Sequence, residues 1–422
     1  MMKNLFPAMA VCYFMILAAC SAQIPSSPVQ NTVAQIQPGA ERMEVYLPYL
    51  VNKKVAVFAN PTSMVGSSHL VDTLLKRGVN VVKIFGPEHG FRGNASAGEH
   101  VEDGKDAATG IPVISLYGNH KKPTPEDVKD VDVLIFDIQD IGVRFYTYIS
   151  SLEYYLEAAL ENNKPLLILD RPNPNGFYVD GPILEKEYKS FIGMQPIPVV
   201  YGMTVGEYAL MLAGEKWLSA KANEINAYNI TTEPTTDTAF HVQVIKCKNY
   251  DHTSLYHLPV APSPNLPDMQ SVYMYPSTCF FEGTVLSEGR GTAHPFLIFG
   301  HPALPKNLYP FIPKPNEGAK SSKCYYQQCY GWNEYGTVAE VLAKTNGHIR
   351  LSYLLDTYKI FPGKDSFFLK NNFINKLSGN ADLARQVKNN TNEDEIKKSW
   401  KPGLQAFKLI RKKYLLYKDF ED

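Results

Sequence analysis

Short apolar runs alternate with amphipathic stretches from Glu44 onward. The apolar runs are rich in Val, Ile, Leu and Phe, and each has the length of a buried strand. We expect strands at residues 54–59, 79–85, 112–116, 131–136 and 166–169. Between them, residues 69–77 and 148–162 carry apolar side chains at helical spacing. This order predicts an α/β fold with a Rossmann-like, mostly parallel sheet and helices on both faces.

The pattern changes near residue 225. A helix at 204–213 closes the first region, with Thr204 and Glu207 spaced as a capping box. Beyond it, strand-like segments such as 242–247 mix with Pro-rich loops, and the tail from Ile349 is expected to be mostly helical. We predict a Rossmann-like domain over residues 44–225 and a smaller α+β domain over residues 226–422, with the active site in the cleft between them.

The first residues predict a targeting signal. Lys3 precedes an apolar stretch at 8–19 that is too short to span a membrane, and Leu17-Ala18-Ala19-Cys20 resembles a bacterial lipobox. Residues 1–20 are therefore a predicted lipoprotein signal peptide with Cys20 as the lipidated residue, and 21–43 a flexible tether. The alternative is an ordinary secretory signal with an incidental cysteine. Either signal predicts export, and the lipobox predicts a membrane-anchored protein of the cell envelope, in the periplasm or at the surface.

Composition narrows the classes of partner. The chain has 422 residues, 45% hydrophobic and 20% charged, with a formal net charge of zero, as in a globular protein. Lys and Arg do not cluster, which argues against nucleic acid as the main partner. Cys247, Cys279, Cys324 and Cys329 remain after the signal, with three possible pairings, and 324 and 329 are close enough for a local disulfide.

Polar residues follow most of the predicted strands. They are Asn60 and Ser63, Glu88 and His89, Asp137 and Gln139, and Asp170 and Arg171. In a parallel sheet these loops emerge at one edge, where open α/β sheets place their ligands. The recurrence of such loops predicts a functional site at that edge.

The loop after the second strand carries the most chemistry. It reads Gly86-Pro87-Glu88-His89-Gly90-Phe91-Arg92-Gly93. A turn with solvated charges is the plainer interpretation, but a carboxylate, an imidazole and a guanidinium within five residues favour a functional loop. Close to Phe85 and Phe91, Glu88 would favour its protonated form, which glycoside cleavage requires of its acid. Arg92 could hold a substrate carboxylate.

Common motifs for other chemistries are absent from the sequence. There is no Gly-x-Gly-x-x-Gly or Walker motif, no Gly-x-Ser-x-Gly nucleophile elbow and no His-Glu-x-x-His. We therefore expect no dinucleotide, no other cofactor and no metal ion. Residues 137–148 combine carboxylates and aromatic rings, although carboxylates near a helix start also act as caps.

Several long motifs, in the same order, resemble the NamZ-type exo-β-N-acetylmuramidases. They lie at residues 86–93, 136–148, 170–174, 201–207, 263–267 and 287–292, and the resemblance covers the chain from about residue 44 to its end. It implies a peptidoglycan-recycling glycoside hydrolase that releases N-acetylmuramic acid (MurNAc) from the non-reducing end of MurNAc-GlcNAc saccharides. It also implies a Rossmann-like domain with a smaller second domain and a site between them.

The resemblance assigns roles to particular residues. Glu88 matches the family's proposed catalytic glutamate, and Glu288 and Arg290 fall in its second-domain motif. Val285, Leu297 and Ile298 depart from the usual pattern there, which bears on substrate choice.

Combining the resemblance with the residues, we expect Glu88 to act as acid or base, with Asp137 or Glu288 as the second carboxylate. We expect the substrate to be bound by His89, Arg92, Arg144, Tyr146, Tyr148, Asn265 and Arg290. Retention and inversion stay open. One rival hypothesis is a non-catalytic envelope lipoprotein that binds muropeptides or glycan ends, and a second is an envelope hydrolase of an ester or amide bond.

Overall fold

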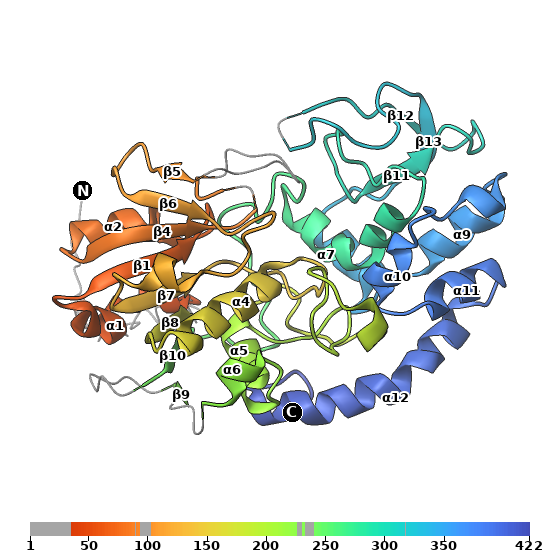
Figure 1. Ribbon diagram of the computed structural model, residues 1–422. Helices are drawn as coiled ribbons and strands as arrows, with labels where there is room; N and C mark the ends of the chain where they lie inside the picture. Colours follow the sequence, from red (N-terminus) through yellow and green to blue (C-terminus); the bar gives the residue numbers. More distant parts are fainter. Residues whose placement is uncertain (1–34, 89, 93–102, 226–229, 233–239, 317) are drawn as a thin grey trace, which may run out of the picture. The chain divides into compact units, whose positions relative to one another are not determined.

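The computed structural model describes residues 35–88, 90–92, 103–225, 230–232, 240–316 and 318–422. Within these residues a large sheet has eight strands. From one edge to the other they are β5 (Gly104–Lys105), β6 (Pro112–Ser115), β4 (Asn80–Gly86), β1 (Lys54–Ala59), β7 (Val133–Asp137), β8 (Leu166–Leu169), β10 (Val242–Ile245) and β9 (Ile230–Thr231) (Figure 1). Neighbouring strands of this sheet pair in parallel, except for β5, which pairs with β6 in antiparallel.

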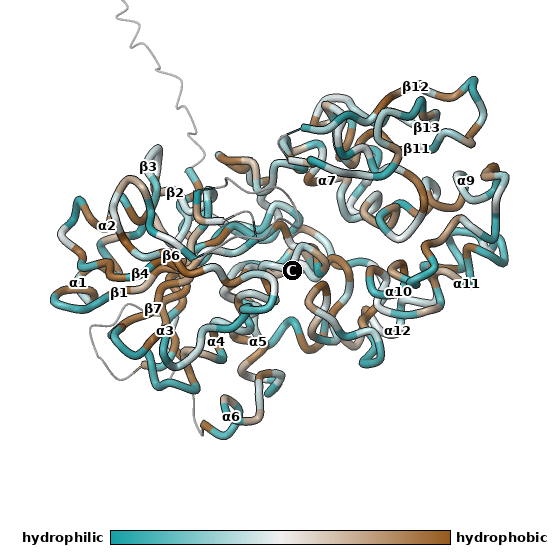
Figure 2. Tube along the Cα trace, turned by 45° about the horizontal axis from the view of Figure 1, so that its top comes forward, coloured by the Kyte–Doolittle hydropathy of each residue, from teal (hydrophilic) through white to brown (hydrophobic). Residues whose placement is uncertain are grey.

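Strand residues alternate between the two faces of this sheet because successive side chains point to opposite sides. On one face Val55 and Val57 pack under α1 (Met43–Leu50) and α2 (Leu70–Lys76). On the other, Ala56 and Phe58 pack with side chains of the helices α3 (Pro125–Val128), α4 (Tyr148–Glu161), α5 (Val205–Gly214) and α6 (Ala220–Asn223). Figure 2 shows the central strands as hydrophobic. The predicted Rossmann-like sheet with helices on both faces is confirmed.

The predicted elements lie close to the observed ones. The strand at Lys54–Ala59 and that at Leu166–Leu169 coincide with β1 and β8, and the other predicted strands are displaced by at most two residues. Thr204 and Glu207 form the predicted capping box at the start of α5. The sheet extends past residue 225, because β9 and β10 continue it.

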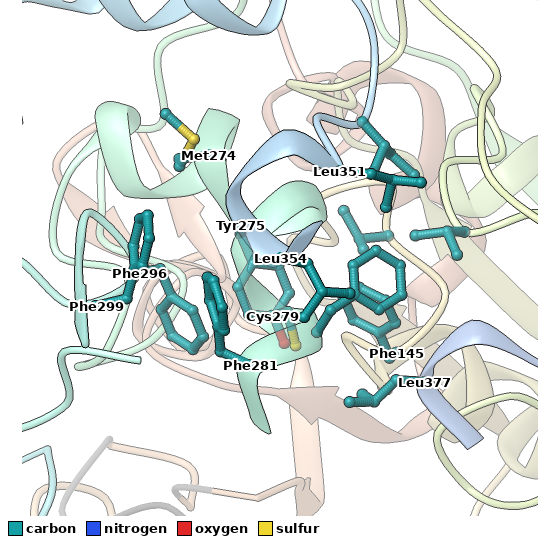
Figure 3. Close-up of a cluster of buried hydrophobic side chains, with 14 of the residues drawn as sticks. Phe145, Met274, Tyr275, Cys279, Phe281, Phe296, Phe299, Leu351, Leu354 and Leu377 are labelled. Carbon is teal, nitrogen blue, oxygen red and sulfur yellow. The ribbon is translucent and has the colours of Figure 1, made fainter. Parts of the chain in front are cut away.

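The remaining chain forms helices around a smaller sheet of β11 (Ile298–His301), β13 (Cys329–Asn333) and β12 (Tyr309–Phe311), all antiparallel. The helices here are α7 (Met269–Thr278), the 3₁₀ turn η3 (Cys279–Gly283), α8 (Val338–Thr345), α9 (Ser352–Ile360), α10 (Phe373–Ser378), α11 (Asp382–Lys388) and α12 (Glu393–Arg411). Figure 3 shows the buried aromatic and aliphatic cluster that they enclose, including Phe145 from the sheet region and Tyr275 of α7.

The helix α12 joins the two cores. Ile396 and Trp400 near its start belong to the C-terminal cluster, whereas Phe407 near its end packs among the helices of the sheet (Figure 1). The four cysteines after residue 240 are free thiols. In the described residues, no helix combines the length and apolarity needed to span a membrane.

Candidate active site

A cavity of about 270 Å³ lies among loops of both regions. From the sheet region it is lined by Glu88, Tyr117, Phe145, Tyr146, Thr147, Tyr148, Phe191 and Ile192, and from the C-terminal region by Ser263, Asn265, Leu266, Tyr275, Glu282, Arg290 and Phe296. We call the group Glu88, Tyr117, Tyr146 and Tyr148 the sheet-side wall, and Glu282 with Arg290 the C-terminal wall. The volume is near the lower end of ordinary ligand pockets, about 300–1,000 Å³, and suits one sugar ring.

Glu88 reaches this cavity because the chain turns sharply after β4. Gly90 has φ of 76°, which favours glycine, and its N–H donates to the Pro87 carbonyl. A Cβ on Gly86 would lie 3.1 Å from the Phe91 nitrogen, so the loop closes tightly on itself. His89 lies outside the described residues.

A tyrosine hydroxyl contacts the Glu88 carboxyl group. The Tyr117 hydroxyl donates to Glu88 Oε1 at 3.1 Å. Burial, together with the negative charge of Glu88, raises the pKa of Tyr117 to about 12, so this hydroxyl stays a donor. Tyr148 accepts a hydrogen bond from Asn60 Nδ2 at 3.0 Å, which orients its ring.

The aromatic surroundings of Glu88 differ from those expected. Phe85 packs against Tyr155 in the core, and Phe91 packs edge-on to His69, and neither ring lines the cavity. Because successive side chains of β4 point to opposite faces of the sheet, Phe85 points to the face that is covered by α4. The rings near the site come instead from Tyr117 and from the start of α4.

Ion pairs build the C-terminal wall. Arg290 pairs with Glu282, and its Nε also lies 3.3 Å from Glu288 Oε1. Lys323 lies 2.8 Å from Glu288 Oε2. Burial opposes the charged form of Glu288, but Lys323 and Arg290 outweigh it and lower the Glu288 pKa. Burial likewise opposes the charge of Arg290, and the two carboxylates outweigh it and raise the Arg290 pKa.

Two predicted arginines have internal partners. Arg92 is bonded to both oxygens of Asp72 and of Asp106, away from the cavity lining. Arg144 is fully buried and donates to the carbonyls of Pro182, Ile197 and Leu377, and burial lowers its pKa to about 9. Neither guanidinium is presented to a ligand in this cavity.

The two predicted second carboxylates also lie outside the cavity lining. Asp137 is buried in a bidentate pair with Arg171, at 2.6 and 2.9 Å. Glu288 is 3% exposed and sits behind Arg290. Glu282 lines the cavity instead. Glu282 was not predicted as a site residue from the sequence. Its position directly before Gly283, in the Gly-rich stretch up to Thr292, could have indicated such a role.

Tyr146, Tyr148, Asn265 and Arg290 line the cavity with Glu88, where their predicted roles require them, and those roles remain predictions. Asn265 Nδ2 donates to the Gly318 carbonyl at 2.8 Å, which fixes the orientation of the amide because a carbonyl needs a donor. Among the described residues Asn265 Oδ1 is buried without a hydrogen-bond partner, so it is an acceptor available to a ligand.

The polar residues at the carboxyl edge of the sheet come together as predicted, but they bind mainly each other. Ser63 Oγ donates to the Asp137 carbonyl, and Gln139 donates to that of Pro172. Asn60 links this cluster to Tyr148. The cluster is therefore the scaffold beneath the sheet-side wall. No group of three or more His, Cys, Asp and Glu side chains in the described ranges is arranged to hold a metal ion.

Comparisons with known proteins agree over most of the chain. The family described as "Exo-beta-N-acetylmuramidase NamZ, N-terminal" matches residues 55–270, and the family of the C-terminal part matches 273–417. The chain is 38% identical over 421 residues to the peptidoglycan beta-N-acetylmuramidase NamZ of Bacillus subtilis (strain 168), covering 96% of this chain and 97% of that protein.

Two solved structures are also similar. Both are crystal structures of DUF1343 family proteins from Bacteroides fragilis NCTC 9343. The first is 44% identical with a TM-score of 0.80 and covers 92% of this chain and all of its own. The second is 29% identical with a TM-score of 0.73 and covers 91% of this chain and 99% of its own.

Proposed function

The chain belongs to the NamZ family of exo-β-N-acetylmuramidases, and from this premise we propose how its cavity releases N-acetylmuramic acid from the non-reducing end of peptidoglycan fragments. The protein is a glycoside hydrolase, as its family is. The observation that carries the residue-level proposal is the cavity, of a size for one sugar ring, that brings Glu88, seven aromatic rings and Arg290 together.

Glu88 acts as the proton donor to the glycosidic oxygen. Its carboxyl group lies in the cavity, within hydrogen-bond distance of the Tyr117 hydroxyl. As the C–O bond between MurNAc and the leaving sugar breaks, Glu88 transfers its proton to the glycosidic oxygen, and the leaving sugar departs with that oxygen as a hydroxyl group. The tyrosines at the start of α4 offer ring faces and hydroxyls to the sugar.

Arg290 recognises the carboxylate that distinguishes MurNAc from GlcNAc. Within the described residues its pairings use Nε and Nη2, which leaves Nη1 for a ligand. A guanidinium matches a carboxylate better than an ammonium does because its donors are planar and spaced for two oxygens. Asn265 Oδ1, which has no hydrogen-bond partner among the described residues, accepts a hydrogen bond from the sugar.

A paired assay tests this function. The purified protein, beginning after the tether, is incubated with a chromogenic β-MurNAc glycoside and with its β-GlcNAc counterpart. We expect release from the MurNAc compound alone. Equal release from both would contradict the role of Arg290. No release, combined with measurable binding of MurNAc-GlcNAc, would favour the binding-protein hypothesis, which the family membership argues against.

We further propose that the protein is exported and anchored through Cys20, which lies outside the described residues. The support is the lipobox-like pattern ending at Cys20 and the Pro- and Ser-containing tether after it. Expressed in a bacterium, the full chain is expected in the membrane fraction, and Cys20→Ala in the soluble exported fraction. A variant that stays membrane-bound would contradict lipid anchoring.

A further inference from the structure

Glu88 and Glu282 are the carboxylates that line the cavity among the described residues. They come from distant parts of the chain, one from the loop after β4 and the other from η3 after α7. Hydrolysis of a glycoside by protein groups alone calls for two carboxyl groups at the scissile bond, each with its own role. Glu282 is therefore the candidate for the second carboxyl group, beside the acid Glu88.

The backbone around Glu282 is firmly held. A Cβ on the next residue, Gly283, would lie 2.6 Å from the Ile374 Cα, so the turn packs directly on α10. Lys323 Nζ donates to the carbonyls on both sides of the turn, of Phe281 at 2.7 Å and of Thr284 at 3.1 Å. A residue fixed in this way can be positioned against a reacting atom with little reorganisation.

Four charged side chains at and behind the C-terminal wall alternate in sign along a series of ion pairs. Glu282 pairs with Arg290, Arg290 with Glu288, and Glu288 with Lys323. Glu288 is buried and pairs with two cations, Arg290 and Lys323, so its charge is neutralised by protein groups and is not presented to a ligand. Glu282 ends the series with a half-buried side chain, 21% exposed, that faces the cavity.

We propose that Glu282 is the nucleophile of the reaction, an assignment that rests on the proposed function. A carboxylate bonded to a guanidinium is a weak proton acceptor but keeps its negative charge beside an electron-poor carbon. That suits attack on the anomeric centre better than removal of a proton from water. Glu88, bonded to a hydroxyl, takes the complementary part of acid and then base.

The reaction then proceeds in two displacements at the anomeric carbon. A Glu282 oxygen forms a bond to C1 of MurNAc while the glycosidic C–O bond breaks, and the leaving oxygen takes the proton of Glu88. Water then adds to C1 as the ester bond to Glu282 breaks, and Glu88 takes the proton of that water. Both carboxyl groups return to their starting states, and the released MurNAc has the β configuration of the substrate.

The first measurement is the anomer formed initially by the wild-type protein, followed by ¹H NMR. The β anomer first is the expected result, and the α anomer first would overturn the proposal. A wild-type protein inactive on every MurNAc substrate would instead count against the proposed function, so the two failures are separable.

The second measurement uses Glu282→Gln and Glu282→Ala, with thermal unfolding to confirm that they fold. We expect kcat to fall at least about 1,000-fold in each, as loss of a nucleophile does. Azide should restore turnover of a chromogenic substrate by Glu282→Ala and yield the α-glycosyl azide, whereas Glu88→Ala with azide should yield the β-azide. Absence of the α-azide from a folded Glu282→Ala protein would overturn the proposal.

Glu334→Gln is the matched control. Glu334 also pairs with a cation, Lys344 at 2.9 Å, and it lies outside the cavity lining. Its activity should stay within about twofold of wild type, in keeping with the small effects of substitutions remote from a site. A folded Glu282→Gln protein as active as this control would overturn the proposal.

Discussion

The two walls of the cavity hold their carboxylates by different means. On the sheet-side wall Glu88 meets a tyrosine hydroxyl, and the neighbouring rings are oriented by a buried polar cluster. On the C-terminal wall Glu282 ends a series of ion pairs. The first carboxyl group is therefore held by a neutral hydroxyl and the second by a guanidinium. The contrast fits our proposal, in which Glu88 transfers the proton and Glu282 attacks the anomeric carbon.

Glu88→Gln is expected to give the largest effect. The amide keeps the shape of the side chain and can still accept from Tyr117, but it has no proton to exchange. We expect kcat on MurNAc-GlcNAc to fall at least about 1,000-fold, within the range of 10²–10⁴ typical of a general acid. Steady-state kinetics with thermal unfolding would check this, and substantial residual activity in a folded protein would remove Glu88 from the role.

Arg290→Lys tests the other wall. The Lys ammonium retains the charge, but it lacks the planar set of donors with which a guanidinium can bind Glu282, Glu288 and a substrate carboxylate at the same time. We expect kcat/KM for the β-MurNAc glycoside to fall by about 10- to 100-fold, or about 1.4–2.7 kcal/mol. Arg92→Lys is the matched variant, since Arg92 also bonds two carboxylates but lies outside the cavity lining. Equal losses in both variants would contradict the distinction.

Asp140→Asn probes the loop between β7 and α4, where the buried Asp140 carboxyl group accepts hydrogen bonds from the Tyr201 hydroxyl and the Gly142 N–H. Burial raises the Asp140 pKa to about 7, so the folded protein binds this proton more tightly than the unfolded chain does, where the pKa is near 3.8. The stabilisation is full below the unfolded pKa and is lost as pH rises through about 7. Raising the pH from 5 to 7 should therefore lower the free energy of unfolding by about 2 kcal/mol.

Denaturant unfolding at the two pH values measures this loss. The Asn variant should lose less stability over the same interval, because an amide does not titrate there. An unchanged pH dependence would assign the titration to other buried carboxyls, such as Glu153 and Asp170, whose pKa values are raised to about 7 and about 6, mainly by burial.

Tyr117→Phe should give the smallest effect. It removes the hydroxyl that donates to Glu88 Oε1 and leaves the ring in the cavity lining. Loss of one hydrogen bond to a charged group is worth about 1.5–3 kcal/mol when no water replaces it, and water entering the open cavity should reduce this to a loss of threefold to tenfold in kcat. A loss as large as that of Glu88→Gln would make Tyr117 itself a proton-transfer residue.

Much of the sheet could be predicted because strands buried on both faces read as continuous apolar runs. Leu166–Leu169 is such a run, and its observed bounds equal the predicted ones. The loops at the carboxyl edge were also predicted, since parallel strands all end there. The smaller sheet was harder to define, because its short strands alternate weakly and pair across distant segments, as Ile298 does with Asn333.

The site was predicted less well than the fold, and the arginines show why. Arg92, Arg144 and Arg290 each follow an apolar or glycine-rich segment, and sequence spacing does not separate them. Three carbonyls brought together from separate parts of the chain enclose Arg144, and two distant aspartates bind Arg92. The partners that decide which guanidinium meets a ligand are set by tertiary packing alone.

The last residues of the chain complete a polar cluster at the heart of the sheet region. The Tyr417 hydroxyl donates to Asp170, and the Leu416 N–H donates to Glu207. Asp419 forms a buried pair with Arg411. During synthesis, Asp170 and Glu207 can already be bonded by Thr204, Gly206 and His252, and they gain these last two hydrogen bonds only when the C-terminus has left the ribosome. A stop codon that removed the last seven residues would delete both of these hydrogen bonds and the Arg411–Asp419 pair, and so weaken the buried polar cluster of the sheet region.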